Sequence, residues 1–238
     1  MQVGLHKGDC LELLKDIPDK SIDLVVTDPP YLMNCGQGGG AFGRDKREYH
    51  SEIDPLTDNF NLEVLNELVR IMKKINIYIW CSKDQLRQYI DFFGDLGCKT
   101  ELLSWHKTNP VPTCNNKYLS DTEYLLFFRE KGVKIYGEYA TKRKFYVTPT
   151  NKEDKDKYRH PTIKPLYIIE NLIVNSSREG DTVLDCFMGS GTTGVACINT
   201  NRNFIGMELD EQYFNVAQDR INKTRSEWLD KLLMGGME

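Results

Sequence analysis

The feature that most constrains the fold is an alternation of short β-strand patterns with helical patterns along all 238 residues. Strands are expected at 3–8, 21–27, 75–82, 98–107, 122–128, 181–187 and 203–208. Helices are expected at 10–17, 60–74, 83–97, 165–176 and 190–200, with a last long helix capped by Asp210. Such alternation predicts a doubly wound, mostly parallel α/β sheet that helices cover on both faces.

In sheets of this kind, ligands bind at the carboxyl ends of the strands. Two unusual stretches follow strands that are far apart in the sequence: "TDPPY" at 27–31 and "DCFMGSGTT" at 185–193. The fold is expected to bring both to the same edge of the sheet. Neither Pro29 nor Pro30 has an N–H to donate, so the first stretch must end its strand.

Length and composition are those of one globular domain, which we take as residues 1–238. No apolar run is long enough to cross a bilayer, and the first ten residues contain no signal-peptide core, so a cytoplasmic protein is expected. The seven cysteines include no C-x-x-C pair and no histidines at zinc-ligand spacing, so no metal is expected.

Basic residues are concentrated in one part of a chain whose net charge is −4. Between Arg129 and Lys164 there are eleven Lys/Arg against five Asp/Glu, so this stretch carries +6 and the rest −10. Tyrosines and a phenylalanine lie among the basic residues, which suits a phosphate-bearing partner whose bases can stack. We interpret residues 129–159 as a basic insertion and candidate target-recognition segment, although a solvated surface insertion has the same composition.

The glycine-rich stretch at 185–193 runs from a predicted strand into a predicted helix. With Gly194 it satisfies G-x-G-x-x-G, and Glu208 follows at the end of the next strand, where a carboxylate can accept hydrogen bonds from a ribose diol. Sites for NAD and for S-adenosylmethionine share this arrangement, so these signals alone do not distinguish the two. A Walker phosphate loop is excluded because no Gly-Lys-Ser/Thr follows.

Two further features favour S-adenosylmethionine. "HPTIKP" at 160–165 offers the hydroxyl of Thr162 and the ammonium of Lys164 at a helix start, and both suit an amino-acid carboxylate. Asp9 ends the first strand, where its carboxylate could accept from an adenine amino group. The alternative reading of Asp9 is a helix N-cap, and the two roles are compatible.

Together these motifs resemble those of the S-adenosylmethionine-dependent DNA amino-methyltransferases. The tetrapeptide "DPPY" precedes the glycine-rich motif, the permuted order of the β class of that family, and the resemblance covers nearly the whole chain. It implies a Rossmann-like methyltransferase fold, S-adenosylmethionine as cofactor, double-stranded DNA as partner, a homodimer and a role in restriction-modification. The implied cofactor-binding residues are Asp9, Cys10, His160, Thr162, Lys164, Asp185, Phe187, Gly189, Gly191, Thr192, Thr193 and Glu208.

The implied catalytic residues are Asp28, Pro29, Pro30 and Tyr31. Asp28 and a proline carbonyl can each accept one N–H of an exocyclic base amine, so that its lone pair points at the activated methyl group. These contacts strengthen as positive charge develops on nitrogen, and they therefore stabilise the transition state more than the ground state. Tyr31 would stack on the base, which must flip out of the duplex to reach the pocket.

Asp at the first motif position favours adenine N6 over cytosine N4, by analogy within the family. The alternatives are an N4-cytosine enzyme, an RNA or protein amide methyltransferase, and a catalytically silent DNA-binding relative. The glycine-rich loop at 36–43 is predicted to order over the DNA, or to be an idle surface loop. Candidate DNA-binding residues are Lys107, Asn109, Lys142, Arg143 and Lys144.

Overall fold

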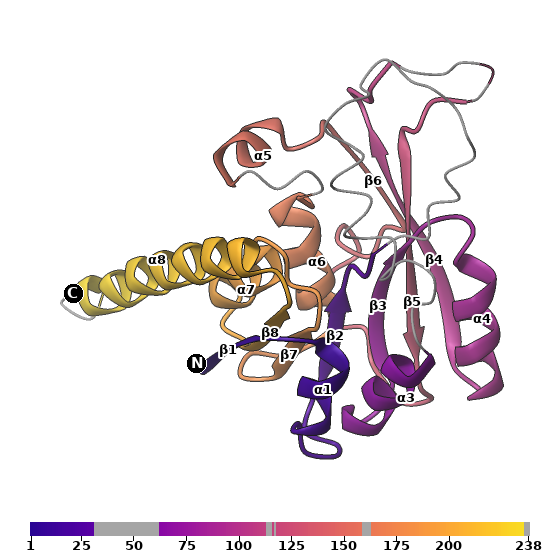
Figure 1. The fold of residues 1–238 in the computed structure, drawn as a ribbon, viewed down its shortest axis with the longest axis horizontal. Helices are drawn as coiled ribbons and strands as arrows, with labels where there is room; N and C mark the ends of the chain where they lie inside the picture. The colour runs from indigo at the N-terminus through magenta and orange to yellow at the C-terminus, as the bar shows by residue number, and fades with distance from the viewer. Residues whose placement is uncertain (31–61, 113–115, 117, 159–162, 236–238) are drawn as a thin grey trace.

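An eight-stranded sheet is the frame of the computed structural model, which describes residues 1–30, 62–112, 116, 118–158 and 163–235 (Figure 1). Its strand order is β1-β8-β7-β2-β3-β5-β4-β6. The strands are β1 (Val3–Lys7), β2 (Leu24–Thr27), β3 (Asn76–Cys81), β4 (Lys99–Lys107), β5 (Thr122–Arg129), β6 (Phe145–Thr148), β7 (Thr182–Asp185) and β8 (Asn203–Glu208).

The sheet is mostly parallel, as the sequence predicts. Parallel pairing joins β1, β8, β7, β2 and β3, while β5 is antiparallel to both β3 and β4. Strand β6 pairs in parallel with β4 at the end of the sheet. Because β5 alone runs the other way, the edge formed by the carboxyl ends of its neighbours also receives the first residues of β5.

Helices cover both faces of the sheet, which confirms the predicted layers (Figure 1). On one face lie α1 (Cys10–Lys15), α3 (Leu62–Ile71) and α4 (Leu86–Asp95). On the other lie α6 (Leu166–Ser176), α7 (Thr192–Asn199) and α8 (Glu211–Gly235). The basic insertion, for which no regular element was predicted, contains β6 and the short helix α5 (Lys152–Tyr158).

Alternation of side chains across the pleat divides the core into two layers. In β2, Leu24 and Val26 pack under α6 and α7, whereas Val25 packs under the helices of the opposite face. All six residues of β3 are buried. Strands that are apolar on both faces are what a sheet covered by two helical layers requires.

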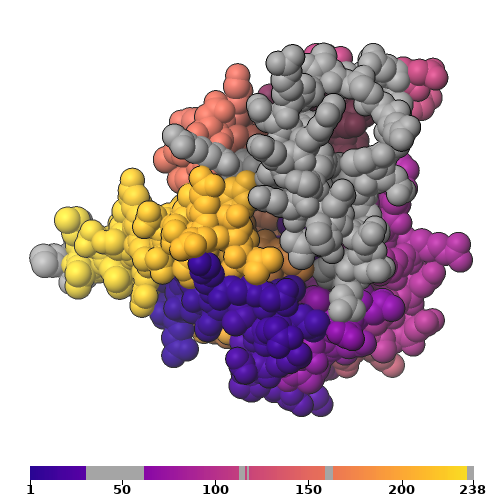
Figure 2. Space-filling model, viewed as in Figure 1, coloured from indigo at the N-terminus to yellow at the C-terminus, as the bar shows by residue number. Residues whose placement is uncertain are grey.

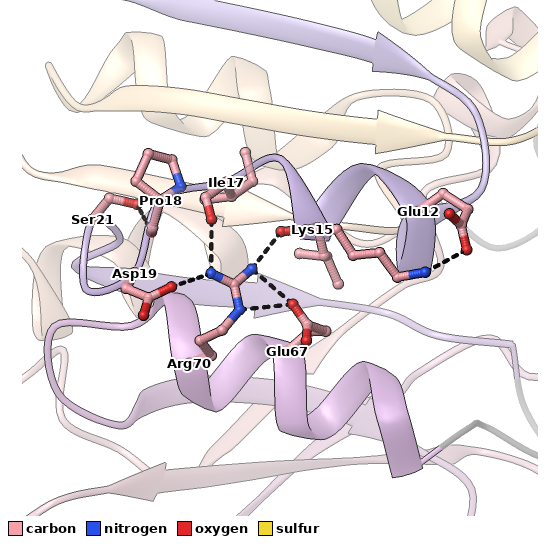
Figure 3. Close-up of polar contacts among 9 residues, drawn as sticks. Glu12, Lys15, Ile17, Pro18, Asp19, Ser21, Glu67 and Arg70 are labelled. Carbon is pink, nitrogen blue, oxygen red and sulfur yellow. Dashed lines mark hydrogen bonds and ion pairs between the residues drawn. The ribbon is translucent and has the colours of Figure 1, made fainter.

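Arg70 of α3 fixes the turn that leads from α1 into β2 (Figure 3). Its guanidinium donates to the carbonyl oxygens of Leu14 at 2.8 Å and Ile17 at 3.0 Å, and it also pairs with Glu67 and Asp19. A guanidinium is rigid and has five donors, so it can hold two carbonyls and two carboxylates at once. This anchorage sets the start of the strand that ends at the proline motif.

Helix α8 is the longest of the described helices, and its C-terminal part projects away from the rest of the molecule (Figures 1 and 2). Its first half packs on α7 and β8 through Ala217 and Ile221. Among the described residues, no helix has the length and apolar character needed to cross a membrane.

Candidate active site

Two motifs meet where β2 and β7 end side by side. The two strands pair in parallel, with Leu24 opposite Val183 and Val25 opposite Leu184, so Asp28 follows β2 beside the end of β7 at Asp185. The Thr27 hydroxyl donates to Oδ1 of Asp185 at 3.0 Å, a buried contact between residues 158 positions apart. The predicted meeting of the "TDPPY" and "DCFMGSGTT" stretches is therefore confirmed for their described residues.

The glycine-rich loop turns into α7 through two glycines with positive φ, Gly189 at 50° and Gly191 at 78°. Gly191 is the N-cap of α7, and a Cβ there would lie 3.1 Å from the Ala217 backbone. At Gly194, a Cβ would lie 2.4 Å from Ile221. Gly189 and Gly191 therefore allow the turn, and Gly191 and Gly194 allow α8 to pack closely against α7.

Asp185 organises this loop from the inside and is almost fully buried. Its carboxylate accepts from the Thr27 hydroxyl, from the Thr193 hydroxyl at 2.6 Å and from the Phe187 N–H at 3.1 Å. Burial raises the pKa of Asp185 to about 7, although the three donors act to lower it. The structure therefore places Asp185 and Thr193 beneath the loop.

Glu208 ends β8, the strand next to β7, and Asp9 follows β1, the strand beyond it. Glu208 accepts from the main-chain N–H groups of Gly189 and Asp210, both at 2.9 Å. Burial raises the pKa of Glu208, while these main-chain donors act to lower it. Asp9 is the N-cap of α1, since its Oδ1 accepts from the N–H of Leu11 at 2.9 Å, which confirms the capping role.

Cys10, predicted to bind the cofactor, is the first residue of α1 and is partly buried. Burial, with a contribution from the charge of Asp9, raises the pKa of its thiol to about 12, so the group is neutral at physiological pH. The parallel register places Lys7 opposite Glu208, and the N–H of Gly8 donates to the Glu208 carbonyl at 3.0 Å. The fold thus brings the start of α1 and the end of β8 together beside the glycine loop.

The proline motif is held by a buried glutamine that sequence reasoning missed. Gln85 is 0% exposed; its Nε2 donates to the Pro30 carbonyl oxygen at 3.2 Å, and its Oε1 accepts from the Ser82 N–H at 3.0 Å. The amide thus ties the Pro30 carbonyl to the turn after β3. A polar side chain at the start of an amphipathic helix looks solvent-facing in sequence, so no local signal marked Gln85.

Asp28 forms an ion pair with Lys164, which lies just before α6. The Lys164 ammonium is 2.6 Å from Oδ2 of Asp28 and 3.0 Å from Oε2 of Glu123, on β5. It also lies 4.9 Å from the centre of the Trp80 ring. In the structure Lys164 contacts two protein carboxylates, and its expected contact with a cofactor carboxylate stays a prediction.

Glu123 in turn pairs with Lys107, the last residue of β4, at 2.6 Å. Burial acts to raise the pKa of Glu123, but Lys164 and Lys107 outweigh it and lower the value to about 2. For Lys164, burial acts to lower the pKa, but Asp28 and Glu123 raise it above its usual value. Glu123 and Lys164 are therefore both charged at neutral pH.

The other candidate DNA-binding residues lie beyond this cluster. Asn109 is exposed and accepts from the Thr150 N–H at 2.6 Å, while Lys107 is mostly buried in its pair with Glu123. Lys142 and Arg143 are exposed before β6, and Lys144 pairs with Glu101. Tyr31, His160, Thr162 and the loop at 36–43 lie outside the described residues.

Arg220 of α8 links the glycine loop to the basic insertion and was also missed. Its Nη1 donates to the carbonyl oxygen of Ser190 at 3.2 Å and to the Thr192 hydroxyl at 3.0 Å. The guanidinium carbon lies 4.4 Å from the centre of the Tyr158 ring, and Nη2 lies 3.8 Å from Asp154, both on α5. Helix α5 is thereby fixed against the loop.

Within the part of the chain that the structure describes, no group of three or more His, Cys, Asp or Glu side chains could hold a metal ion. The ionisable side chains at the end of the sheet pair with each other and with main-chain donors. The site therefore combines a glycine-turned loop, a carboxylate at the end of β8 and an acid followed by two prolines.

Comparisons with known proteins agree with this arrangement. A family model described as DNA methylase, of the N6/N4 methyltransferases, matches residues 22–219. The type II methyltransferase M2.LlaDCHI of Lactococcus lactis subsp. cremoris is 32% identical over 92% of this chain and 89% of its own. The type II methyltransferase M.HinfI of Haemophilus influenzae is 32% identical over 92% of this chain and 68% of its own.

Solved structures show the same fold. The crystal structure of the M1.HpyAVI–SAM complex has a TM-score of 0.69 and 26% identity, covering 92% of this chain and 100% of that one. PvuII DNA methyltransferase, named as cytosine-N4-specific, has a TM-score of 0.70 at 18% identity, covering 97% of this chain and 93% of that one; this likeness concerns the fold. The family match spans both the proline motif and the glycine loop, and the chain is therefore a member of the N6/N4 DNA methylase family.

Proposed function

We propose that this DNA methyltransferase transfers a methyl group from S-adenosylmethionine to the N6 amine of a flipped-out adenine by direct in-line displacement. The observation that carries the proposal is the position of Asp28-Pro29-Pro30 at the end of β2, beside the loop that Asp185 organises after β7. An acceptor for a base amine and a candidate cofactor loop thus share one edge of the sheet.

The residues present fit S-adenosylmethionine, the ligand in the solved M1.HpyAVI–SAM complex. Glu208 would accept from the ribose hydroxyls, because each carboxylate oxygen retains acceptor capacity beyond its one main-chain N–H. Asp9 would accept from the adenine amino group while it caps α1. The loop from Phe187 to Thr192 would line the cofactor, which supplies a methyl group activated on a sulfonium.

At the reacting amine, Asp28 would accept one N–H and the Pro30 carbonyl the other. The two prolines restrict the backbone, and Gln85 holds the Pro30 carbonyl at 3.2 Å, so the acceptors need little reorganisation when the amine arrives. Tyr31 would stack on the base. Each contact with the amine strengthens as its nitrogen becomes positive, so it favours the transition state.

A base in a duplex cannot reach a pocket at the end of the sheet, so the target must leave the stack at a cost of a few kcal/mol. The basic insertion at 129–159 would contact the phosphate backbone near the target and carry the sequence preference. Its exposed Lys142, Arg143 and Tyr139 support this role, as does the proximity of α5 to the glycine loop through Arg220.

The test is methylation of unmodified genomic DNA with tritiated S-adenosylmethionine, followed by digestion to nucleosides and identification of the labelled base. N6-methyladenine is expected, and Asp28→Ala should abolish the label while leaving cofactor binding largely intact. Label in N4-methylcytosine would contradict the base assignment. A near-normal rate for Asp28→Ala would contradict the role of Asp28.

The proposal also covers the enzyme's location in the cell and its oligomeric state. We place the enzyme in the cytoplasm, where its DNA substrate would be, and in a homodimer, as the family resemblance implies. Light scattering on the purified protein should then give twice the mass of one chain. Mapping the methylated positions in a genome that expresses the protein would reveal its recognition sequence.

A further inference from the structure

One buried ammonium connects two carboxylates at the end of the sheet. Lys164 is 6% exposed, and its Nζ lies 2.6 Å from Asp28 and 3.0 Å from Glu123. The ring of Trp80, on β3, lies 4.9 Å from the same nitrogen. Asp28 follows β2, Trp80 lies on β3 and Glu123 on β5, so groups from three parts of the sheet surround the Lys164 ammonium.

Glu123 reaches this place because β5 runs opposite to its neighbours. Its carboxylate binds Lys164 through Oε2 and Lys107 through Oε1. The result is a row of alternating charges, Lys107–Glu123–Lys164–Asp28, which we name the charge row; its formal charge is zero. A buried charge without a partner is costly, and in this row each charge lies within ion-pair distance of an opposite one.

Sharing the ammonium also suits the chemistry expected at Asp28. Positive charge develops on the target amine, and an ammonium 2.6 Å from its acceptor would oppose that charge if nothing balanced it. Glu123 supplies the balancing negative charge on the far side of Lys164. Lys164 can then fix the orientation of the Asp28 carboxylate without making the site positive.

We propose that Lys164 is a positioning residue for Asp28, held in place by Glu123, and that it does not serve as the ligand of the cofactor carboxylate. The inference rests on the proposed function, because it takes Asp28 as the acceptor for the target amine. Lys164 already contacts two carboxylates, so a third carboxylate at the same ammonium would add negative charge to a row whose formal charge is zero. The segment "SDTEYLLFF" resembles one that lines the active site in the family, but no motif assigned Glu123 a role of its own.

The first test compares Lys164→Met and Lys164→Arg in single-turnover reactions at saturating S-adenosylmethionine, together with calorimetric titration of the cofactor alone. Lys164→Met should lower the rate by about a hundredfold, the cost of misplacing a catalytic group by roughly 1 Å, and leave cofactor affinity little changed. Lys164→Arg, which keeps the charge, should recover part of the rate. A normal saturated rate with affinity weakened by about tenfold or more would show a cofactor ligand and overturn the inference.

A second variant separates positioning from charge balance. Lys164→Met alone leaves the row with a net negative charge, so it should lower thermal stability as well as the rate. The double variant Lys164→Met/Glu123→Gln removes one charge of each sign, and it should regain stability while its rate remains low. If the double variant recovers the wild-type rate, Lys164 only balances charge and the inference is wrong.

Asp28→Ala in the same assays distinguishes this inference from the proposed function. An inactive Asp28→Ala together with a Lys164→Met enzyme of normal rate and normal cofactor affinity would remove the role of Lys164 and leave that of Asp28. Near-normal activity of Asp28→Ala would instead remove the proposed function, and the positioning role with it.

Discussion

Thr27 donates its hydroxyl hydrogen to Oδ1 of Asp185 at 3.0 Å, and this bond joins the last residue of β2 to the last residue of β7. Both side chains are buried, at 1% and 4% exposure. On one side of this contact lies the proline motif and on the other the glycine-rich loop. The relative position of the two therefore depends on a polar contact inside the core.

Thr27→Val should destabilise the protein by about 1–3 kcal/mol, because it leaves a buried carboxyl group without one of its donors. Urea unfolding followed by circular dichroism measures this loss. Thr27→Ser keeps the hydroxyl and is the matched control, expected to lose less. Equal stability of the Val variant and the wild type would show that the Asp185 carboxyl does not need this donor.

Gln85→Met should reduce the methylation rate by about tenfold with little effect on cofactor affinity. Methionine has a similar length but cannot donate to the Pro30 carbonyl, so the carbonyl would lose the contact that holds it. Single-turnover kinetics and calorimetry measure the two quantities separately. Arg87→Met, on the same helix with a side chain 91% exposed, is the control and should behave as wild type. A Gln85→Met enzyme of normal rate would mean that the prolines alone fix the carbonyl.

Much of this fold could be predicted from the sequence because each buried strand is an apolar run with a turn signal after it. The strand expected at 75–82 is β3 in the structure, and the strand expected at 181–187 is β7 with the start of its glycine loop. Strand β6 was not predicted from the sequence. Only Tyr146 of its four residues is buried, so "FYVT" within a basic segment has no strong strand pattern. Helix α5 contains no buried residue and therefore has no apolar stripe to detect.

The positions of Asp28, Gly191 and Glu208 at one edge of the sheet were predictable, because each lies at or just after the end of a recognisable strand. The site was not predictable where long-range pairing decides the role of a residue. The partners of Lys164 depend on β5 lying antiparallel beside β3, which no local pattern around Glu123 reveals. Arg220 is one of several basic residues on a helix with apolar positions, and its contacts with Ser190 and Thr192 arise only from the packing of α8.

Lys142→Ala/Arg143→Ala should weaken binding to duplex DNA to a similar extent for all sequences, because both exposed groups are expected to contact phosphates. The slope of log K against log salt should decrease in magnitude by about 2, roughly one for each lost phosphate contact. Fluorescence anisotropy with a labelled duplex across a salt series measures this slope. Lys15→Ala/Lys20→Ala removes the same charge from the opposite edge of the sheet, and an equal effect of that variant would argue against a role for the insertion.

Asp185→Asn should change how stability depends on pH. The pKa of Asp185 is raised from 3.8 to about 7 in the folded chain, so between these values the folded state binds a proton that the unfolded state has released. Its contribution to stability is therefore complete below pH 3.8 and is lost as the pH rises through 7. Glu123, lowered to about 2, contributes in the opposite sense, but its effect lies below its usual value of 4.5 and leaves the range from pH 5 to 7 unaffected.

The measurement is the free energy of unfolding of wild type and Asp185→Asn in urea at pH 5, 6, 7 and 8. Asparagine does not titrate, so the wild type minus the variant isolates Asp185 from other groups such as Glu208. This difference should fall by up to about 1.4 kcal/mol per pH unit between pH 5 and 7 and then level off. A difference that does not change between pH 5 and 8 would contradict the raised pKa of Asp185. It would mean that the hydrogen bonds from the Thr27 and Thr193 hydroxyls and the Phe187 N–H outweigh burial and keep the carboxylate ionised.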